Sequence, residues 1–331
     1  MRLTRRATLA GLGAVALARP ALAQTPFKIF QITYRGETDV ERGFRAYFEQ
    51  RDIPVTIIHR SAELDPANVP AILEEVRAEA PDLVYTWGTP VTLGTFGRAD
   101  SVDPDKHITD RPGVFTMVSA PTRSGVVPSR ASSTRNITGT SHVVPPEPQL
   151  RAMEAYRPFK KLGVLYTSTE PNARAIVEAV RAFQAPMGFE LIERTFRLDG
   201  DGKPIIDGAA DLVDEIADEG AGWLYYLPDT FLSSNIGSVA PQATARGLPG
   251  FSATERLQGD ALISLVSRYF SLGQLTAYKA EQILVQGVAP ASIPIETLQR
   301  FALIINMPLA KQLSLYPPLG MLSYADVLTA G

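Results

Sequence analysis

Short apolar runs alternate along the chain with segments whose apolar residues recur every three to four positions. The first run is 27–34 (FKIFQITY). It is followed by 39–52, in which Val40, Phe44 and Phe48 lie on one helix face. Runs of the first kind predict β-strands and segments of the second kind predict helices. The repeated order of strand, turn and helix is typical of βαβ units, which build parallel sheets.

This order continues through two halves of similar length, separated by the proline-rich VVPPEP at 143–148. In the first half, strands are predicted at 27–34, 53–60, 81–87, 113–121 and 137–142, with helices at 39–52 and 66–80. In the second half, strands are predicted at 161–168, 189–198, 222–229, 249–255 and 259–270, with helices at 147–156, 171–185, 208–219 and 271–287. Two α/β halves predict two lobes with a cleft between them.

The first 23 residues have the composition of a cleaved export signal. Basic residues precede an apolar run from Ala7 to Ala18, and Ala21-Leu22-Ala23 follows as a small-residue cleavage site. Arg5-Arg6 is the pair typical of a twin-arginine signal, with an ordinary secretory signal as the alternative. The apolar run has about 12 residues and a spanning helix needs roughly 20, so membrane insertion is not expected. We expect a soluble periplasmic protein.

Composition narrows the possible partners and chemistry. The chain has no cysteine, which excludes disulfides, thiolate metal sites and a cysteine nucleophile. Four of the 32 Lys and Arg residues lie in the signal, which leaves 28 against 35 Asp and Glu and a net charge near −7. Nucleic acid and anionic membrane surfaces are therefore not expected as partners.

Residues at the carboxyl ends of the predicted strands are the candidates for ligand contact, because parallel α/β sheets bind ligands at that edge. Many are short hydroxyl residues or begin helices, and such groups suit oxygen atoms of a ligand. Thr89 before Pro90 fits a helix N-cap, with a plain strand-to-helix turn as the alternative. The candidates are Tyr34, Arg35, Trp87, Gly88, Thr89, Ser119, Ala120, His142, Tyr166, Thr167, Glu170, Asn172, Pro228, Asp229 and Thr254.

Arg35 is the candidate with the most specific chemistry. At the end of the first strand, beside Tyr34 and Trp87, it would bind a carboxylate between aromatic walls. A solvated loop charge is the alternative for Arg35, and core packing is the alternative for Trp87 and Tyr166.

No catalytic or metal-binding pattern is visible in the sequence. The three histidines, His59, His107 and His142, lack the spacing of metal ligands. The chain also has no Gly-x-Ser-x-Gly elbow and no Walker loop. We expect a non-enzymatic protein without a cofactor.

Several stretches together resemble the substrate-binding proteins of ABC transporters, in particular the subgroup with tryptophan- and tyrosine-binding members. They span nearly all of the chain after the signal, in the same order as in that family. The stretches are GTP (88–90), FTMVSAP (115–121), NITGTSHVVPPEPQL (136–150), KKLGVLYTSTEPNAR (160–174), LYYLPDT (224–230) and SLGQLTAYKAEQILVQGVAPASIPIE (271–296).

The resemblance implies a type I periplasmic binding protein, with two Rossmann-like lobes that have parallel sheets and are joined by a three-crossover hinge. It implies a first lobe of 27–141 plus 268–292 and a second lobe of 142–267 plus 293–331, which would close the chain with a strand and a helix. It also implies a monomer that clamps a small molecule between the lobes and delivers it to a membrane permease with its ATPase. A periplasmic sensory module that presents its ligand to a receptor is the alternative.

Two positions depart from the family's pattern. Ser119-Ala120-Pro121 stands where the family commonly has Thr-Asp-Pro, and Ala253-Thr254 stands where acidic residues are common. Such acids can pair with a ligand ammonium group. The ligand is therefore left open between an aromatic amino acid and an aromatic or other carboxylate.

Overall fold

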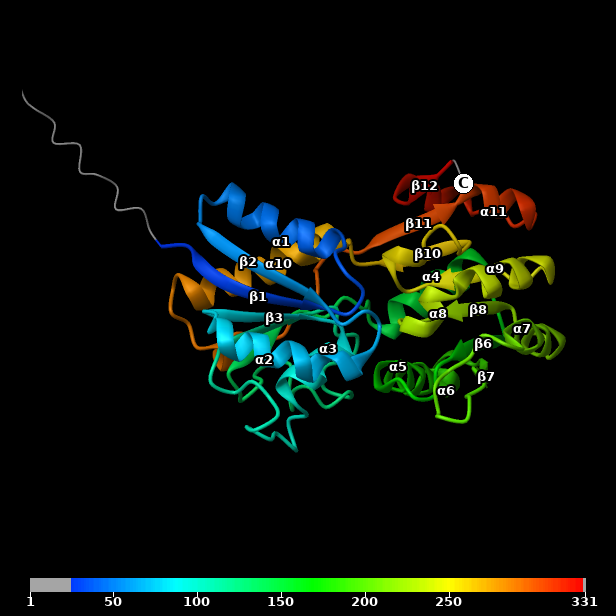
Figure 1. Ribbon diagram of the computed structural model, residues 1–331. Coiled ribbons are helices and arrows are strands. Elements are labelled where there is room, and N and C mark those ends of the chain that lie inside the picture. Colours follow the sequence, from blue (N-terminus) through cyan, green and yellow to red (C-terminus); the bar gives the residue numbers. More distant parts are fainter. Residues whose placement is uncertain (1–24, 330–331) are drawn as a thin grey trace, which may run out of the picture.

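The computed structural model describes residues 25–329 as two α/β lobes, each built on its own sheet (Figure 1). The export signal expected at 1–23 lies outside the described residues. Within 25–329, no helix has both the length and the apolarity needed to cross a membrane.

The first lobe contains a five-stranded parallel sheet in the order β2-β1-β3-β4-β5. Helices α1 and α10 lie together on one side of this sheet, and α2 and α3 lie on the other (Figure 1). The strands are β1 (Phe27–Thr33), β2 (Val55–Ser61), β3 (Leu83–Trp87), β4 (Gly113–Thr116) and β5 (Ile137–Gly139), and the helices are α1 (Asp39–Gln50), α2 (Val69–Glu79), α3 (Thr89–Phe96) and α10 (Tyr269–Leu284).

The second lobe contains a seven-stranded sheet in the order β12-β11-β10-β9-β8-β6-β7. All of its neighbouring strands are parallel except β10 and β11. Its strands are β6 (Lys161–Tyr166), β7 (Glu190–Thr195), β8 (Trp223–Tyr226), β9 (Gly250–Ser252), β10 (Ile263–Val266), β11 (Ala302–Asn306) and β12 (Asp326–Leu328). Its helices are α4 (Pro146–Tyr156), α5 (Pro171–Arg181), α6 (Gln184–Met187), α7 (Ala209–Asp218), α8 (Thr230–Ser234), α9 (Ile236–Ala245) and α11 (Met307–Gln312).

Two glycines bring α10 against α1 and so return the chain to the first lobe. A Cβ atom at Gly273 would lie 1.9 Å from the carbonyl oxygen of Val40, and one at Gly43 would lie 2.0 Å from that of Phe270. Only hydrogen fits at either position, since backbone atoms cannot move aside as a flexible side chain can. The close approach fixes α10, whose first turn contributes to the cleft described below.

The chain passes between the lobes three times: after β5, after β10, and between α10 and β11. Two hydrogen bonds bear on where the last passage begins, for which the expected boundary follows residue 292. The Ile295 amide donates to the Arg130 carbonyl oxygen at 2.7 Å, and the Ser141 amide donates to that of Glu296 at 2.8 Å. Both bonds hold this segment on the first lobe, so we propose that the third crossing lies near 299–301.

Most of the strands and helices expected from the hydrophobic pattern are present, with corrections at their ends. The strand expected at 113–121 ends at Thr116, and that expected at 259–270 covers only Ile263–Val266 because α10 already begins at Tyr269. The pattern did not reveal α8, α9 or β12. The closing strand and helix expected from the resemblance are β11 and α11.

Candidate functional site

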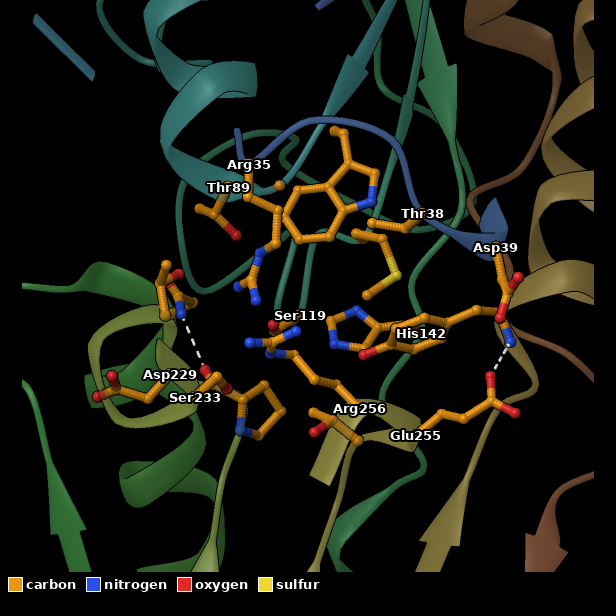
Figure 2. Close-up of a pocket in the computed structure, with 18 of the residues that line it drawn as sticks. Arg35, Thr38, Asp39, Thr89, Ser119, His142, Asp229, Ser233, Glu255 and Arg256 are labelled. Carbon is orange, nitrogen blue, oxygen red and sulfur yellow. Dashed lines mark hydrogen bonds between the residues drawn. The ribbon is translucent and has the colours of Figure 1, made fainter. Parts of the chain in front are cut away.

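A cavity of about 430 Å³ lies between the lobes, at the carboxyl ends of both sheets (Figure 2). Residues from the first lobe, the second lobe and two crossings line it. Ten of the fifteen candidate residues contribute: Arg35, Trp87, Gly88, Thr89, Ser119, His142, Asn172, Pro228, Asp229 and Thr254.

The other five candidates do not line the cavity. Tyr34 is buried in the core of the first lobe, and Ala120 packs against that of the second. The Tyr166 hydroxyl donates to Glu193 of the neighbouring strand β7 at 3.3 Å. Thr167 and Glu170 lie behind Asp229 and bond to it or to the helix it caps. We leave these five out of the proposed site.

The sequence reasoning missed eleven lining residues, because it considered strand ends and not the helices and turns beyond them. Arg256 lies only two positions after the candidate Thr254, so the strand-end rule pointed close to it. The missed residues are Thr38, Asp39, Arg42, Pro90, Met117, Thr230, Ser233, Glu255, Arg256, Gln258 and Tyr269.

Arg35 extends from the end of β1 into the cavity. Its guanidinium carbon lies 5.1 Å from the centre of the Trp87 ring, close enough for a cation–π contact. Its Nε atom is buried without a hydrogen-bond partner. Burial and the nearby charge of Arg256 lower the pKa of Arg35, which remains a cation. The Trp87 ring is therefore covered by Arg35 at this position and is not an open aromatic wall.

Arg256 enters the cavity from the second lobe. It belongs to a 3₁₀ turn, Glu255–Leu257, that follows β9. Among residues 25–329, its side chain forms no ion pair and no hydrogen bond, and it is exposed toward the cavity. Figure 2 shows the Arg35 and Arg256 guanidinium groups reaching into the same part of the cleft.

The acidic residues that line the cavity are already engaged by protein groups. Asp39 forms an ion pair with Arg42. The Glu255 carboxylate accepts from Arg268 Nη1 at 2.9 Å and from the Tyr269 amide at 2.6 Å. Among residues 25–329, Arg35 and Arg256 thus form no ion pair, whereas these two acids each form one. The carboxylates of Glu170 and Asp260 act on Arg35 and Arg256, respectively, only at longer range.

Asp229, the third lining acid, is the N-cap of α8. Its carboxylate accepts from the Thr167 amide at 2.6 Å, the Thr167 hydroxyl at 3.0 Å and the Leu232 amide at 2.8 Å. Behind it, the Glu170 carboxylate accepts from the Thr230 amide at 3.0 Å. Burial and the charge of Glu170 raise the pKa of Asp229 to about 7. Asp229 therefore carries much less negative charge toward the cavity than an ordinary aspartate.

Among residues 25–329, several buried polar atoms of the residues that line this cavity have no hydrogen-bond partner. They come from side chains that are at most 6% exposed. Most can donate a hydrogen bond, as a bound anion requires. They are Trp87 Nε1, Thr89 Oγ1, His142 Nδ1, Asn172 Oδ1 and Thr254 Oγ1.

His142 lies at the first crossing and is 4% exposed. Burial and the charge of Arg35 lower the pKa of His142 to about 3. The imidazole is therefore neutral at pH 7. A neutral imidazole can offer one N–H donor to a ligand without adding a charge to the cleft.

The turn at 88–90 differs in register from the prediction. Gly88, with φ at +86°, is the N-cap of α3, and Thr89 is the first helical residue. Thr89 makes no capping bond, so its hydroxyl is free to face a ligand. Met117, which follows β4, also has a left-handed backbone, with φ at +56°. This conformation is costly for a side chain other than glycine and is often found at functional sites.

Residues 45–328 match the family of ABC transporter substrate-binding proteins. The chain belongs to this family. The family contains ligand-binding components of transport systems, and its match confirms the resemblance seen in the sequence.

One relative of this chain is the tyrosine-binding protein of Clostridioides difficile (strain R20291). It is 23% identical over 266 residues, which cover 79% of this chain and 71% of the relative. A conserved domain protein from Vibrio cholerae superposes with a TM-score of 0.78 and 23% identity, covering 92% of this chain and 99% of that one. An ABC domain from Streptococcus pneumonia, solved with L-Trp, superposes with a TM-score of 0.75 and 20% identity, covering 91% and 100%. These similarities confirm the type I periplasmic binding fold.

Proposed function

We propose that this protein captures a small carboxylate ligand between its two lobes and delivers it to an ABC permease and its ATPase, without converting it chemically. The observation that carries the proposal is the pair of arginines without counter-ions, Arg35 and Arg256, which enter one cavity from opposite lobes. A guanidinium group binds a carboxylate through two parallel hydrogen bonds. A ligand held by both would join the lobes.

The proposed setting is the periplasm, with the first 23 residues as the export signal. Family membership supports a role in transport, since the family's members are transport components. Closure around the ligand would present a surface that the permease can distinguish from the ligand-free form.

The known ligands of relatives bear on the choice of carboxylate. Tyrosine and L-Trp appear in the names of two similar proteins, and both molecules carry a carboxylate that Arg35 or Arg256 could bind. Their ammonium group needs an acidic or carbonyl partner. The engaged state of Asp39 and Glu255 in this chain favours a carboxylate without that group.

The test is a thermal-shift screen of the exported protein with amino acids, aromatic carboxylates, aliphatic acids and purines, followed by calorimetry. Ligand at 100 times its dissociation constant stabilises the folded state by about 2.7 kcal/mol. For the carboxylate that binds, Arg35→Gln should weaken binding by about 1.5 to 3 kcal/mol. Arg157→Gln removes the same charge from an exposed position outside the cavity and away from the three crossings, and it should leave binding unchanged.

Two results would count against the proposed function. One is that no compound in the screen raises the unfolding temperature of the protein. The other is a bound compound that is recovered chemically altered after incubation with the purified protein. In cells, deletion of the gene should abolish uptake of the bound compound while the permease is retained.

A further inference from the structure

We infer that the ligand is a dicarboxylate without an ammonium group, with one carboxylate held by Arg35 and the other by Arg256. This inference rests on the proposed function and specifies the ligand class of the same cavity. Three observations support it: the positive charges that face the cleft, the ion pairs that two of the lining carboxylates already form, and the buried polar atoms that have no hydrogen-bond partner among residues 25–329.

The charges that face the cleft call for two negative groups. Of the lining cations, Arg42 is paired with Asp39, whereas Arg35 and Arg256 are unpaired among residues 25–329. Asp229 forms no ion pair with either arginine among these residues, and its oxygens are engaged by three protein hydrogen bonds. A ligand with one carboxylate would leave one of the two positive charges uncompensated when the lobes cover it, and an uncompensated buried charge is costly.

The lining carboxylates of Asp39 and Glu255 are already in ion pairs, and this disfavours a ligand that carries an ammonium group. Glu255 already neutralises Arg268 at the second crossing, and withdrawing it from that bond would leave Arg268 with only Asp326 as an ion-pair partner. An ammonium group in this cleft would also lie close to two guanidinium groups and be repelled by them. A zwitterionic amino acid is therefore a poorer fit than a dianion of the same size.

The lining polar atoms without hydrogen-bond partners among residues 25–329 come from both lobes and the first crossing, and all but the acceptor Asn172 Oδ1 can donate. Trp87 Nε1 and Thr89 Oγ1 belong to the first lobe, and Thr254 Oγ1 belongs to the second. Gly88, Thr89 and Pro90 place the N-terminus of α3 at the cavity, where the helix dipole favours an anion. Donors on both walls suit two separate carboxylates better than a single compact anion such as phosphate.

The experiment compares matched ligands on the exported protein by calorimetry. One series is succinate, butyrate and 4-aminobutyrate, which share a four-carbon skeleton. The other is terephthalate, benzoate and 4-(aminomethyl)benzoate, which present the same groups on a ring. Longer aliphatic dicarboxylates, phthalate, isophthalate, L-tyrosine, L-tryptophan and inorganic phosphate complete the panel. At least one dicarboxylate should bind about 10- to 100-fold more tightly than its monocarboxylate and ammonium-bearing counterparts, since each charged hydrogen-bonded contact contributes that much.

Two variants assign the carboxylates to the arginines. Arg35→Gln and Arg256→Gln should each weaken dicarboxylate binding about 10- to 100-fold and reduce the preference over the matched monocarboxylate. Arg157→Gln should preserve both the affinity and the preference. Circular dichroism and the unfolding temperature without ligand show whether each variant is folded.

The possible results separate the inference from the proposed function. If a monocarboxylate, an aromatic amino acid or phosphate binds more tightly than every dicarboxylate, the dicarboxylate inference is wrong, although capture of a small molecule stands. If no dicarboxylate and no other compound binds, both the inference and the proposed function fail. Tight dicarboxylate binding that survives both arginine substitutions also overturns the inference.

Discussion

His142 should make the folded protein lose stability in mild acid. Its pKa falls from the ordinary 6.5 to about 3 because the imidazole is buried and lies near Arg35. Below pH 6.5 the unfolded chain therefore takes up a proton that the folded protein does not. The stability that depends on neutral His142 is fully present above pH 6.5 and is lost as the pH falls toward 3.

The size of this loss at pH 5 follows from the distance between pH 5 and the unfolded pKa. The difference is about 1.5 pH units, and each unit corresponds to 1.36 kcal/mol, so the loss is about 2 kcal/mol. His142→Asn has a similar size and hydrogen-bonding capacity but does not titrate in this range. The variant should lose about 2 kcal/mol less stability than the wild type between pH 7.5 and pH 5.

Urea unfolding of both proteins at the two pH values measures this difference directly. Other titrating groups contribute equally to the wild type and the variant, so they cancel in the comparison. If both proteins lose the same stability between pH 7.5 and pH 5, His142 is not held neutral by its surroundings and the reasoning fails. An NMR titration that shows a protonated His142 at pH 5 would lead to the same conclusion.

Three further predictions concern positions around the cleft. Gly273→Ala should destabilise the protein by about 1 to 3 kcal/mol or more in thermal or urea unfolding, because its Cβ would overlap a carbonyl oxygen of α1. Asp229→Asn should destabilise the protein, because its amide nitrogen would face a backbone N–H that the carboxylate now accepts from. The loss should be smaller at pH 8 than at pH 5, because burial and Glu170 raise the pKa of Asp229 and wild-type stability falls as pH rises toward 7; an equal loss at both pH values in urea would refute this. Tyr166→Phe should leave ligand affinity in calorimetry unchanged, since its hydroxyl contacts Glu193 outside the cavity, and a tenfold loss would bring Tyr166 back into the site.

The fold was largely predictable because buried parallel strands leave a strong signal in the sequence. All five residues of β3 are buried, and their apolar character marks the strand plainly. The short helix α8 was not predictable in this way. It has five residues and depends on the Asp229 side chain and on Glu170, which comes from a different part of the chain. Edge strand β12 has three residues, and two of them are exposed, so its apolar pattern is too weak to detect.

The site was predictable as a location and only partly as a set of residues. The rule that ligands bind at strand ends selected Arg35, Trp87 and Thr89, and all three line the cavity. It could not reveal that Glu255 is occupied by Arg268, because those side chains meet only through the folding of the second crossing. It also could not distinguish Tyr166 from the cavity-lining residues. Tyr166 has the same strand-end position in the sequence, but its hydroxyl contacts Glu193 of β7.

The most direct test of the central claim is a crystal structure of the protein with the tightest-binding compound from the panel. We expect a dicarboxylate between the lobes, with oxygens of one carboxylate within hydrogen-bond distance of Arg35 and those of the other within that distance of Arg256. A ligand bound outside this cavity would contradict the account. So would an amino acid whose ammonium group contacts Asp229 or Glu255 while either arginine remains unpaired.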